Sequence, residues 1–308
     1  MTTVLCEISL ALEPLRARFP EVEFIDISET LPEGVRGEIL FGGVGEHSAE
    51  AISRGVRWVQ LSFTGIDHAP TATLQAELVT TARGAGAIPI AEYVMASLLA
   101  SSRDFPRHWL REAPERWNYQ RTTALFGQTL ALVGFGGIAR RVASLADAFN
   151  MNVVATRRHD SHGHDGHVTL APTVTELVRE ADHLVVCAPL TSETHHLIND
   201  DVLRQVKPGV HLVNIARVGL IDQDALRRAL DEGRVRRASL DVTDPEPLPE
   251  GHWLYTHPHV FLTPHSSWTG TPFFSGAIDI FSDNLARYLA KQPLEGVIDR
   301  ELGYRVCT

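Results

Sequence analysis

Three segments of the sequence each offer one side chain with catalytic capacity. Arg217 carries a guanidinium, Glu246 a carboxylate and His265 an imidazole, and each follows a short apolar run that is typical of a buried strand. Arginine binds anions with paired donors, and imidazole exchanges a proton near neutral pH. Taken singly, each residue is more commonly a surface charge or a turn residue. Together, each after an expected strand, the three form a set of catalytic candidates.

A glycine-rich turn earlier in the chain predicts where a dinucleotide binds. Residues 134–139 read Gly-Phe-Gly-Gly-Ile-Ala; an apolar run precedes them, a segment with helical spacing follows, and a second apolar run comes next. Strand, turn, helix and strand in this order seat a pyrophosphate on a helix N-terminus. Gly134 allows the tight turn, Gly136 lets the backbone approach the phosphates, and Ala139 keeps helix and strand close. We expect cofactor contacts at Gly134, Gly136, Gly137 and Ile138.

The acidic residue that usually follows such a turn is missing. NAD sites place Asp or Glu about 20 residues further on, at the end of the second strand, where it binds the ribose 2′-hydroxyl. Here that strand runs into Thr156, Arg157 and Arg158. Guanidinium groups bind a 2′-phosphate that a carboxylate would repel, so the sequence predicts NADP as the preferred cofactor and NAD as the second choice. The alternative is that both arginines are solvated surface charges.

The composition is that of a globular protein with one large or two smaller domains. The chain has 308 residues, of which 44% are hydrophobic and 21% charged. A formal charge of −10 argues against a general binder of nucleic acid or anionic membranes. We see no signal peptide or disulfide framework, and the most apolar expected helix, 90–100, is too short to span a bilayer. We therefore expect a soluble cytoplasmic protein.

Strands alternate with helices along the chain, which predicts an α/β fold with parallel sheets. A small α/β unit is expected over about the first 98 residues, and a dinucleotide unit from about residue 130. The stretch 104–122, rich in Arg, Trp and Pro, is expected to contact another domain or a partner. The expected strands are 4–8, 24–27, 39–41, 56–61, 78–80, 129–133, 151–155, 184–187, 210–215, 238–241 and 260–262, and the expected helices 10–18, 88–100, 138–146, 173–180, 222–232 and 272–290.

One biased segment, residues 159–167, contains His159, His162, His164 and His167 together with two aspartates. The spacing matches no zinc template, and its glycines indicate a flexible loop, so no functional metal is expected.

The sequence resembles the D-isomer-specific 2-hydroxyacid dehydrogenase family over essentially the whole chain, and within it the glyoxylate and hydroxypyruvate reductases. The resemblance implies two doubly wound parallel-sheet domains: a Rossmann-type cofactor domain, residues 99–270, inserted into a flavodoxin-like substrate domain, residues 1–98 plus 271–308. The active site would lie in the cleft between them. Besides the catalytic candidates and the glycine-rich turn, the motifs that carry the resemblance are Gly65-Ile66-Asp67, Ile90-Ala91-Glu92, Ala188 to Thr194, Asn284-Leu285 and Gly303-Tyr304.

Members of this family transfer a hydride reversibly between a nicotinamide and a 2-oxo or 2-hydroxy acid. The resemblance implies that Arg217 holds the substrate carboxylate and carbonyl oxygen, and that His265 donates a proton to that oxygen. Glu246 would pair with His265, orient it and favour its protonated form. Exposed backbone amides at Thr64 and Gly65 would take the substrate carboxylate.

The resemblance also implies further cofactor contacts and a homodimer joined through the cofactor domains. Asp241 would contact the nicotinamide end. Apolar packing is the alternative role for the residues expected to line the cofactor groove, which are Cys187, Ala188, Pro189, Thr194, Ile215 and Ala216.

Two residues depart from the family pattern. Val218 stands where relatives usually have glycine after the catalytic arginine, and its side chain could narrow the site or shift Arg217. Trp268 places an indole where many relatives have small residues, so it caps the substrate pocket or packs between domains.

The leading hypothesis is an NADP-preferring reductase of a small 2-oxo acid of the glyoxylate or hydroxypyruvate type. Relatives with the same fold act on lactate, phosphoglycerate or formate, and fold alone does not choose among them. The alternative is a nucleotide-sensing, corepressor-like protein with weak catalysis. Tight cofactor binding without turnover of any 2-oxo acid would favour that alternative.

Overall fold

The computed structural model describes residues 1–66, 69–117, 122–158 and 162–299, which fall into two compact units. Unit 1 combines residues 1–86 with the segment that begins at Gly270, and unit 2 comprises Ala87–Thr269. Each unit contains a doubly wound, largely parallel sheet, which confirms the α/β fold class expected from the alternation of strands and helices.

The described part of unit 1 contains a five-stranded sheet in the order β2-β1-β3-β4-β5, and all its pairings are parallel. This is the flavodoxin-like order, in which the order of the strands reverses between β1 and β3. The strands are β1 (Thr3–Cys6), β2 (Glu23–Asp26), β3 (Ile39–Gly42), β4 (Trp58–Leu61) and β5 (Leu78–Thr81), and the helices are α1 (Ser9–Arg18), α2 (Ser48–Ser53), α3 (Thr71–Leu74) and α11 (Thr271–Leu289).

Alternate residues of these strands supply two separate cores, one on each face of the sheet. Val4 and Phe41 belong to the core that includes α1 and α11, whereas Leu5 and Leu40 belong to the core on the opposite face. This alternation is the two-residue period of a strand buried on both sides.

Helix α11 returns the chain to the N-terminal sheet. The fully buried ring of Phe281 stacks on Phe41 with ring centroids 4.3 Å apart. Asn284 donates through Nδ2 to Gln60 Oε1 at 2.9 Å, which satisfies a buried polar pair at the same contact. The first and last segments of the chain therefore fold as one unit.

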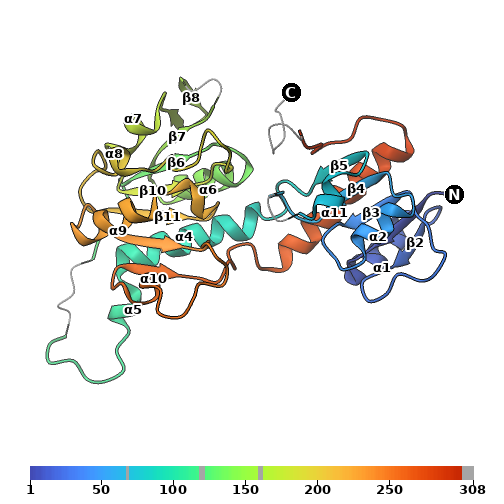
Figure 1. The fold of residues 1–308 in the computed structure, drawn as a ribbon. Helices are drawn as coiled ribbons and strands as arrows, with labels where there is room; N and C mark the ends of the chain where they lie inside the picture. The colour runs from blue at the N-terminus through green and yellow to red at the C-terminus, as the bar shows by residue number, and fades with distance from the viewer. Residues whose placement is uncertain (67–68, 118–121, 159–161, 300–308) are drawn as a thin grey trace. The chain divides into compact units, whose positions relative to one another are not determined.

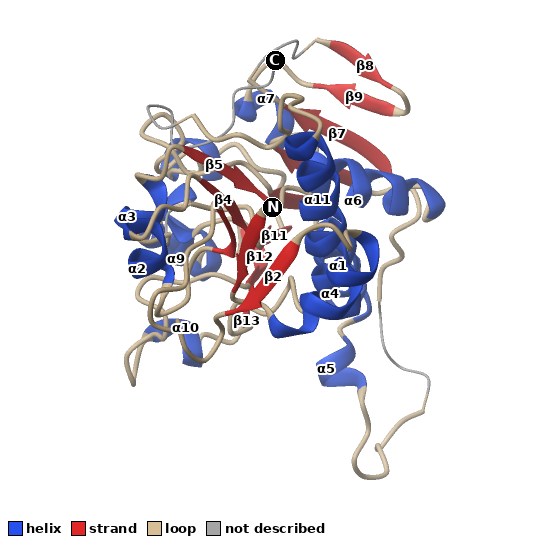
Figure 2. Ribbon diagram, turned by 90° about the vertical axis from the view of Figure 1, so that its right-hand side faces the viewer, coloured by secondary structure: helices blue, strands red, loops and turns tan. Residues whose placement is uncertain are grey.

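The described part of unit 2 contains an eight-stranded sheet in the order β13-β12-β11-β10-β6-β7-β9-β8, in which β8 is antiparallel to β9 (Figure 2). The order of the strands reverses between β6 and β10, which creates the crevice where open α/β sheets bind ligands. The elements are α4 (Ala87–Arg103), α5 (Phe105–His108), β6 (Thr129–Val133), α6 (Gly137–Ala148), β7 (Asn152–Thr156), β8 (Gly163–Asp165), β9 (Val168–Leu170), α7 (Val174–Val178), β10 (His183–Val186), α8 (Asp200–Leu203), β11 (Val210–Asn214), the 3₁₀ turn η1 (Val218–Leu220), α9 (Gln223–Asp231), β12 (Val235–Leu240), α10 (Trp253–Thr256) and β13 (Val260–Leu262).

Helix α4 lies wholly within unit 2, beside α6 and β11 (Figure 1). Its buried residues Ala91, Val94, Met95 and Leu98 share a core with α6 and the strands of this sheet. The division between the units therefore falls at Gly86, ahead of the helix, whereas the sequence analysis placed it after residue 98. A hydrophobic helix gives no indication from its own sequence of which sheet it covers.

The histidine-rich segment is not the flexible loop that the sequence indicated, as far as the structure describes it. Residues Gly163–Asp165 form β8, which pairs with β9 through a turn at Gly166, where φ is +63°. His159 lies outside the described residues. A three-residue strand of polar residues carries no apolar alternation, so hydrophobic periodicity could not reveal it. The short helices α2, α3, α5, α8 and α10 were also missed, because four to six residues are too few to show the helical period.

In the part of the chain that the structure describes, every helix is too short or too polar to cross a bilayer.

A chain of neutral side chains crosses the sheet of unit 2 at the start of its central strands. His183 Nε2 lies 2.8 Å from Gln128 Oε1, the two Nδ1 atoms of His183 and His211 lie 3.2 Å apart, and His211 Nε2 lies 2.9 Å from Ser239 Oγ. One proton per imidazole satisfies all these contacts, whereas a second proton on His183 would place two N–H groups against each other. Burial lowers the pKa of His183 to about 4 and holds the pKa of His211 well below its ordinary value.

This histidine pair predicts a loss of stability on acidification. An unfolded histidine titrates near pH 6.5, so between about pH 6.5 and 4 the unfolded chain binds protons that the folded chain excludes. The free energy of unfolding should fall as the pH drops through this window, by up to about 1.4 kcal/mol per pH unit for each histidine. Urea unfolding of His183→Gln should show a shallower pH dependence than the native protein. The exposed His164→Gln is the control, and equal slopes for all three proteins would contradict the prediction.

Candidate active site

The glycine-rich turn lies at the point where the strand order of the unit 2 sheet reverses. Gly134 directly follows β6 and has φ of +92°, a conformation that side chains other than glycine rarely adopt. A Cβ at this position would lie 2.9 Å from the Cα and the backbone nitrogen of Ala188, which follows β10. The two strand ends therefore approach each other as closely as backbone atoms allow. Glycine is required here by conformation and by space.

Helix α6 begins directly after this turn, with Gly136 as its N-cap and Gly137 as its first residue. Ala139 is fully buried and Ile138 packs against the same core, which fixes the start of the helix against the sheet. The first N–H groups of a helix have no partners within the helix and carry the positive end of its dipole. This arrangement fits a dinucleotide pyrophosphate.

His265 and Glu246 are in direct contact. His265 Nδ1 lies 2.8 Å from Glu246 Oε2, and the other oxygen of Glu246 accepts from the backbone N–H of Thr243 at 2.9 Å. Both side chains are about one-third exposed, at 31% and 34%. His265 has φ of +50°, a left-handed conformation that is uncommon in residues other than glycine.

The buried carboxylate of Asp241 holds the loop that carries His265. Its Oδ1 accepts from Thr263 Oγ1 at 2.6 Å and from the backbone N–H of Ser266 at 2.8 Å, and its Oδ2 accepts from the N–H of Ser267 at 2.9 Å. Tyr93 Oη lies 2.7 Å from Thr263 Oγ1, so α4 takes part in the same network. The contact with the nicotinamide that the family resemblance implies for Asp241 stays a prediction; these bonds show in addition that Asp241 positions the loop, a role that the sequence did not indicate.

Arg217 follows the neighbouring strand β11, at the N-terminal end of η1. The side chain of Asn214 shapes this corner, because its Nδ2 donates to the carbonyl of Arg217 at 2.9 Å and its Oδ1 accepts from the N–H of Ala216 at 3.0 Å. Arg217 Nη1 donates to the carbonyl of Ala216 at 2.7 Å. Val218 is the first residue of η1 and is partly buried.

The three catalytic candidates thus come from the ends of three strands that are adjacent in the sheet, β11, β12 and β13. Parallel strands end at the same edge, so the structure brings Arg217, Glu246 and His265 to one edge of unit 2.

The predicted groove residues after β10 and β11 lie at this same edge. Cys187 donates its backbone N–H to the carbonyl of Val133 at 2.8 Å, and burial raises the pKa of its thiol to about 12, which makes it an apolar wall rather than a nucleophile. Thr194 Oγ1 donates to the carbonyl of Pro189 at 2.7 Å and so shapes the turn after β10. Ala188 and Ile215 are buried, Ala216 is partly buried and Pro189 is exposed.

The predicted substrate residues are distributed over both units. Thr64 and Gly65 follow β4 in unit 1, where Thr64 Oγ1 donates to the carbonyl of Ala82 at 3.4 Å. Asp67 of the same motif lies outside the described residues, as do Gly303 and Tyr304. Trp268 is a half-buried residue of unit 2, in the loop that carries His265.

A carboxylate cradle at the end of β3 was also missed from the sequence. Glu7 Oε2 accepts from the backbone N–H groups of Gly43 at 2.7 Å and Gly45 at 3.0 Å, and Oε1 accepts from Ser48 Oγ at 2.5 Å. A Cβ on Gly42 or Gly45 would lie 2.6 Å from a carboxylate oxygen, so the glycines allow the chain to wrap around it. The available signal was a glutamate directly after β1 and three glycines, Gly42, Gly43 and Gly45, at the end of β3.

The two arginines predicted to bind a 2′-phosphate are both paired with carboxylates. Arg157 Nη1 lies 3.0 Å from Asp165 Oδ2, and Arg158 Nη2 lies 2.5 Å from Glu193 Oε2. Both ion pairs are partly exposed, so the pairing fits either role that the sequence left open. No pattern in the sequence indicated that the β8 hairpin would bring Asp165 back to the end of β7.

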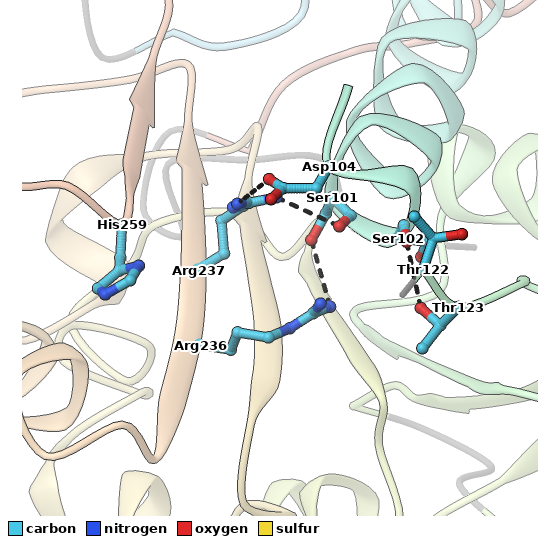
Figure 3. A pocket seen from close by; sticks show the side chains of 8 residues that line it. All are labelled: Ser101, Ser102, Asp104, Thr122, Thr123, Arg236, Arg237 and His259. Atoms are coloured by element: carbon cyan, nitrogen blue, oxygen red, sulfur yellow. Dashed lines mark hydrogen bonds and ion pairs between the residues drawn. The ribbon is translucent and has the colours of Figure 1, made fainter. Parts of the chain in front are cut away.

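A polar pocket of about 170 Å³ lies elsewhere in unit 2. Figure 3 shows the side chains that line it, which include Ser101, Asp104, Arg236 and Arg237. Arg237 forms an ion pair with Asp104 at 2.7 Å and donates to the carbonyl of Ser101 at 3.2 Å. The pocket lies where β12 and β13 begin, on the sheet edge opposite to the catalytic candidates. Arg237 satisfies a carbonyl at the C-terminal end of α4, so we assign this cluster a structural role.

A family model and a curated relative both relate this chain to dehydrogenases of hydroxy acids. Residues 95–267 match the family model described as "D-isomer specific 2-hydroxyacid dehydrogenase, NAD binding domain". The D-3-phosphoglycerate dehydrogenase of Methanocaldococcus jannaschii is 32% identical over 245 residues, which are 76% of this chain but only 46% of that protein. The chain therefore spans about half the length of this curated relative.

Two crystal structures match nearly the full length of the chain. A D-isomer specific 2-hydroxyacid dehydrogenase family protein from Aeromonas salmonicida has a TM-score of 0.82 and 27% identity, covering 97% of this chain and 99% of that one. The TT0316 protein from Thermus thermophilus has a TM-score of 0.73 and 31% identity, covering 97% of this chain and 100% of that one.

The close approach at Gly134 predicts a selective effect of added methyl groups. Gly134→Ala forces a Cβ against the backbone of Ala188 and a left-handed conformation on alanine, so it should lower the free energy of unfolding by about 2 kcal/mol or more. Gly137→Ala is the matched control, because nothing lies within 4 Å of its added Cβ and alanine favours a helix. Thermal unfolding measures both variants, and equal melting temperatures would show that the crevice tolerates expansion.

Proposed function

Because the chain belongs to the D-isomer-specific 2-hydroxyacid dehydrogenase family, we propose that it transfers a hydride between a nicotinamide cofactor and a small 2-oxo or 2-hydroxy acid. The observation that carries the proposal is the contact of 2.8 Å between His265 and Glu246, at the same sheet edge as Arg217 and the glycine-rich turn. A carboxylate–imidazole pair beside a guanidinium suits the reduction of a carbonyl acid.

Each side chain has a distinct part in this chemistry. The bound nicotinamide supplies or accepts the hydride. Arg217 holds the substrate carboxylate and carbonyl oxygen, which fixes the carbonyl for attack. Because Nδ1 of His265 is bonded to Glu246, Nε2 is the atom that donates a proton to the carbonyl oxygen during reduction and removes it during oxidation. Glu246 stabilises the protonated imidazole and orients it.

The groups around the cofactor and substrate have supporting roles. Gly134, Gly136, Gly137 and Ile138 would hold the pyrophosphate, and the segments after β10 and β11 would line the groove. The N–H groups of the turn at Thr64 and Gly65 would bind the substrate carboxylate. In this assignment residues 87–269 form the cofactor domain, and the remainder of the chain forms the substrate domain.

We propose a small substrate of the glyoxylate or hydroxypyruvate type. The support is the bulk of Val218 and Trp268 beside the catalytic residues in sequence, which favours a narrow pocket. The relative named D-3-phosphoglycerate dehydrogenase makes a phosphorylated hydroxy acid the competing substrate class.

We also propose a cytoplasmic homodimer joined through unit 2. The segment after α4 exposes apolar side chains that water does not favour, with Trp109 66%, Trp117 74% and Phe126 74% exposed. A single-chain mass in light scattering would contradict the dimer.

Loss of either catalytic side chain should remove turnover without removing the cofactor. Arg217→Ala and His265→Ala should each lower kcat for glyoxylate reduction by about 100-fold or more, because each removes an interaction made at the reacting carbonyl. Binding of NADPH, measured by titration, should change little. The control is Arg204→Ala, an exposed arginine paired within its own helical turn. Native rates in either catalytic variant would contradict the assigned role.

Steady-state oxidation of the reduced cofactor with a panel of 2-oxo acids tests substrate and cofactor together. We expect turnover with glyoxylate and hydroxypyruvate, and a lower KM for NADPH than for NADH because Arg157 and Arg158 follow β7. A clear NADH preference would remove the NADP proposal and keep the enzyme. Tight cofactor binding without turnover of any acid would favour a nucleotide-sensing protein.

A further inference from the structure

The carboxylate of Asp165 bridges two arginines from different elements. Arg140 donates to it through both terminal nitrogens, from Nη1 to Oδ1 at 3.0 Å and from Nη2 to Oδ2 at 2.8 Å. Arg157 donates from Nη1 to the same Oδ2 at 3.0 Å. The paired bonds from Arg140 are the planar fork geometry in which a guanidinium binds a carboxylate or a phosphate.

These three residues meet at the corner of unit 2 that receives the adenosine ribose in a Rossmann-type site. Arg140 is in the first turn of α6, and its guanidinium carbon lies 4.5 Å from the ring centroid of Phe135 in the glycine-rich turn. Arg157 directly follows β7, the second strand of the motif, where the acid that binds the ribose 2′-hydroxyl usually lies. The β8–β9 hairpin adjoins β7 in the sheet (Figure 2). Its Asp165 places at this corner the carboxylate that the end of β7 lacks.

This corner contains one carboxylate, that of Asp165, and the two guanidinium groups, of Arg140 and Arg157, that a phosphate would need as partners. Hydrogen bonding to Arg140, followed by the charges of Arg140 and Arg157, keeps the pKa of Asp165 below its ordinary value, so the carboxylate is ionised at neutral pH. A 2′-phosphate brings two negative charges to this position and needs the same guanidinium donors. Like charges repel at short range, so the carboxylate and the phosphate compete.

We propose that Asp165 determines cofactor selectivity by competing with the 2′-phosphate of NADP(H) for Arg140 and Arg157. A 2′-phosphate has to displace or share the carboxylate, whereas NAD(H), which has a 2′-hydroxyl, does not. Asp165 therefore limits the preference for NADP that the arginines create. This inference rests on the proposed dinucleotide site and does not depend on which acid the protein reduces.

Asp165→Asn tests the proposal because it removes the charge and keeps the shape and one acceptor oxygen. The dissociation constants of NADPH and NADH can be measured by fluorescence titration of the full chain, without any substrate. We expect NADPH to bind about 10-fold more tightly to the variant, because a like charge has been removed, and NADH binding to change by less than about two-fold. The gain for NADPH should shrink at high salt, because these side chains are partly exposed.

Matched variants separate competition from a general effect of charge or folding. Asp147→Asn removes an equal charge from an exposed position near the other end of α6 and should leave both constants unchanged. Asp165→Glu keeps the charge and should retain native NADPH binding. Arg140→Gln in the Asp165→Asn background should cancel the gain for NADPH. Thermal unfolding of each variant shows that it is folded.

Two results would overturn the proposal. Equal changes in both dissociation constants would show that Asp165 only braces the hairpin against α6. Weaker NADPH binding in Asp165→Asn would show that the carboxylate holds the arginines ready for the phosphate. If the native protein binds neither cofactor, the proposed function fails first, and this result differs from both of the others. A native preference for NADH, combined with a gain for NADPH in the variant, would leave the inference standing.

Discussion

The buried carboxylate of Asp241 is the constraint on which the catalytic edge depends. Asp241 is 1% exposed, and an ionised or polar group at such a position is tolerated only when its oxygens are bonded. Its partners are Thr263, Ser266 and Ser267, which surround His265 in sequence. The need to satisfy this carboxylate therefore fixes the loop backbone, and the loop backbone in turn presents His265 to Glu246.

The parallel sheet explains why residues far apart in sequence meet at that edge. Parallel strands joined by helices all end on the same side, so a side chain that follows each strand is delivered to one place without any specific contact between the segments. The crevice at Gly134 also follows from the topology, because the order of the strands reverses between β6 and β10. Topology thus accounts for the meeting of Arg217, Glu246 and His265, and local bonds account for their orientation.

This distinction explains what could be predicted from the sequence. Apolar runs revealed the strands of both sheets except β8 and β9, and the structure brings the candidate residues that follow three of those runs to one sheet edge. Hydrogen bonds across loops have no periodic signal, so the positioning role of Asp241 and the cradle around Glu7 could not be foreseen. The pairing of Arg157 with Asp165 was missed for a related reason: it depends on a short polar hairpin that lacks apolar alternation.

The crevice with the His265 loop and the corner around Asp165 differ in how much their contacts contribute to the stability of the fold. The crevice at Gly134 and the loop of His265 rest on buried contacts. A Cβ at Gly134 would overlap the backbone of Ala188, and the loss of its partners would leave the carboxylate of Asp241 buried without hydrogen bonds. Either change would lower the free energy of unfolding. The corner formed by Arg140, Arg157 and Asp165 rests on partly exposed ion pairs, with Arg140 49% and Asp165 29% exposed, and such pairs contribute little to folding. Charges at this corner can therefore change without disturbing the fold. The ion pairs of Asp165 are therefore separable from the network around Asp241: the first are partly exposed surface charges, and the second is a satisfied buried network.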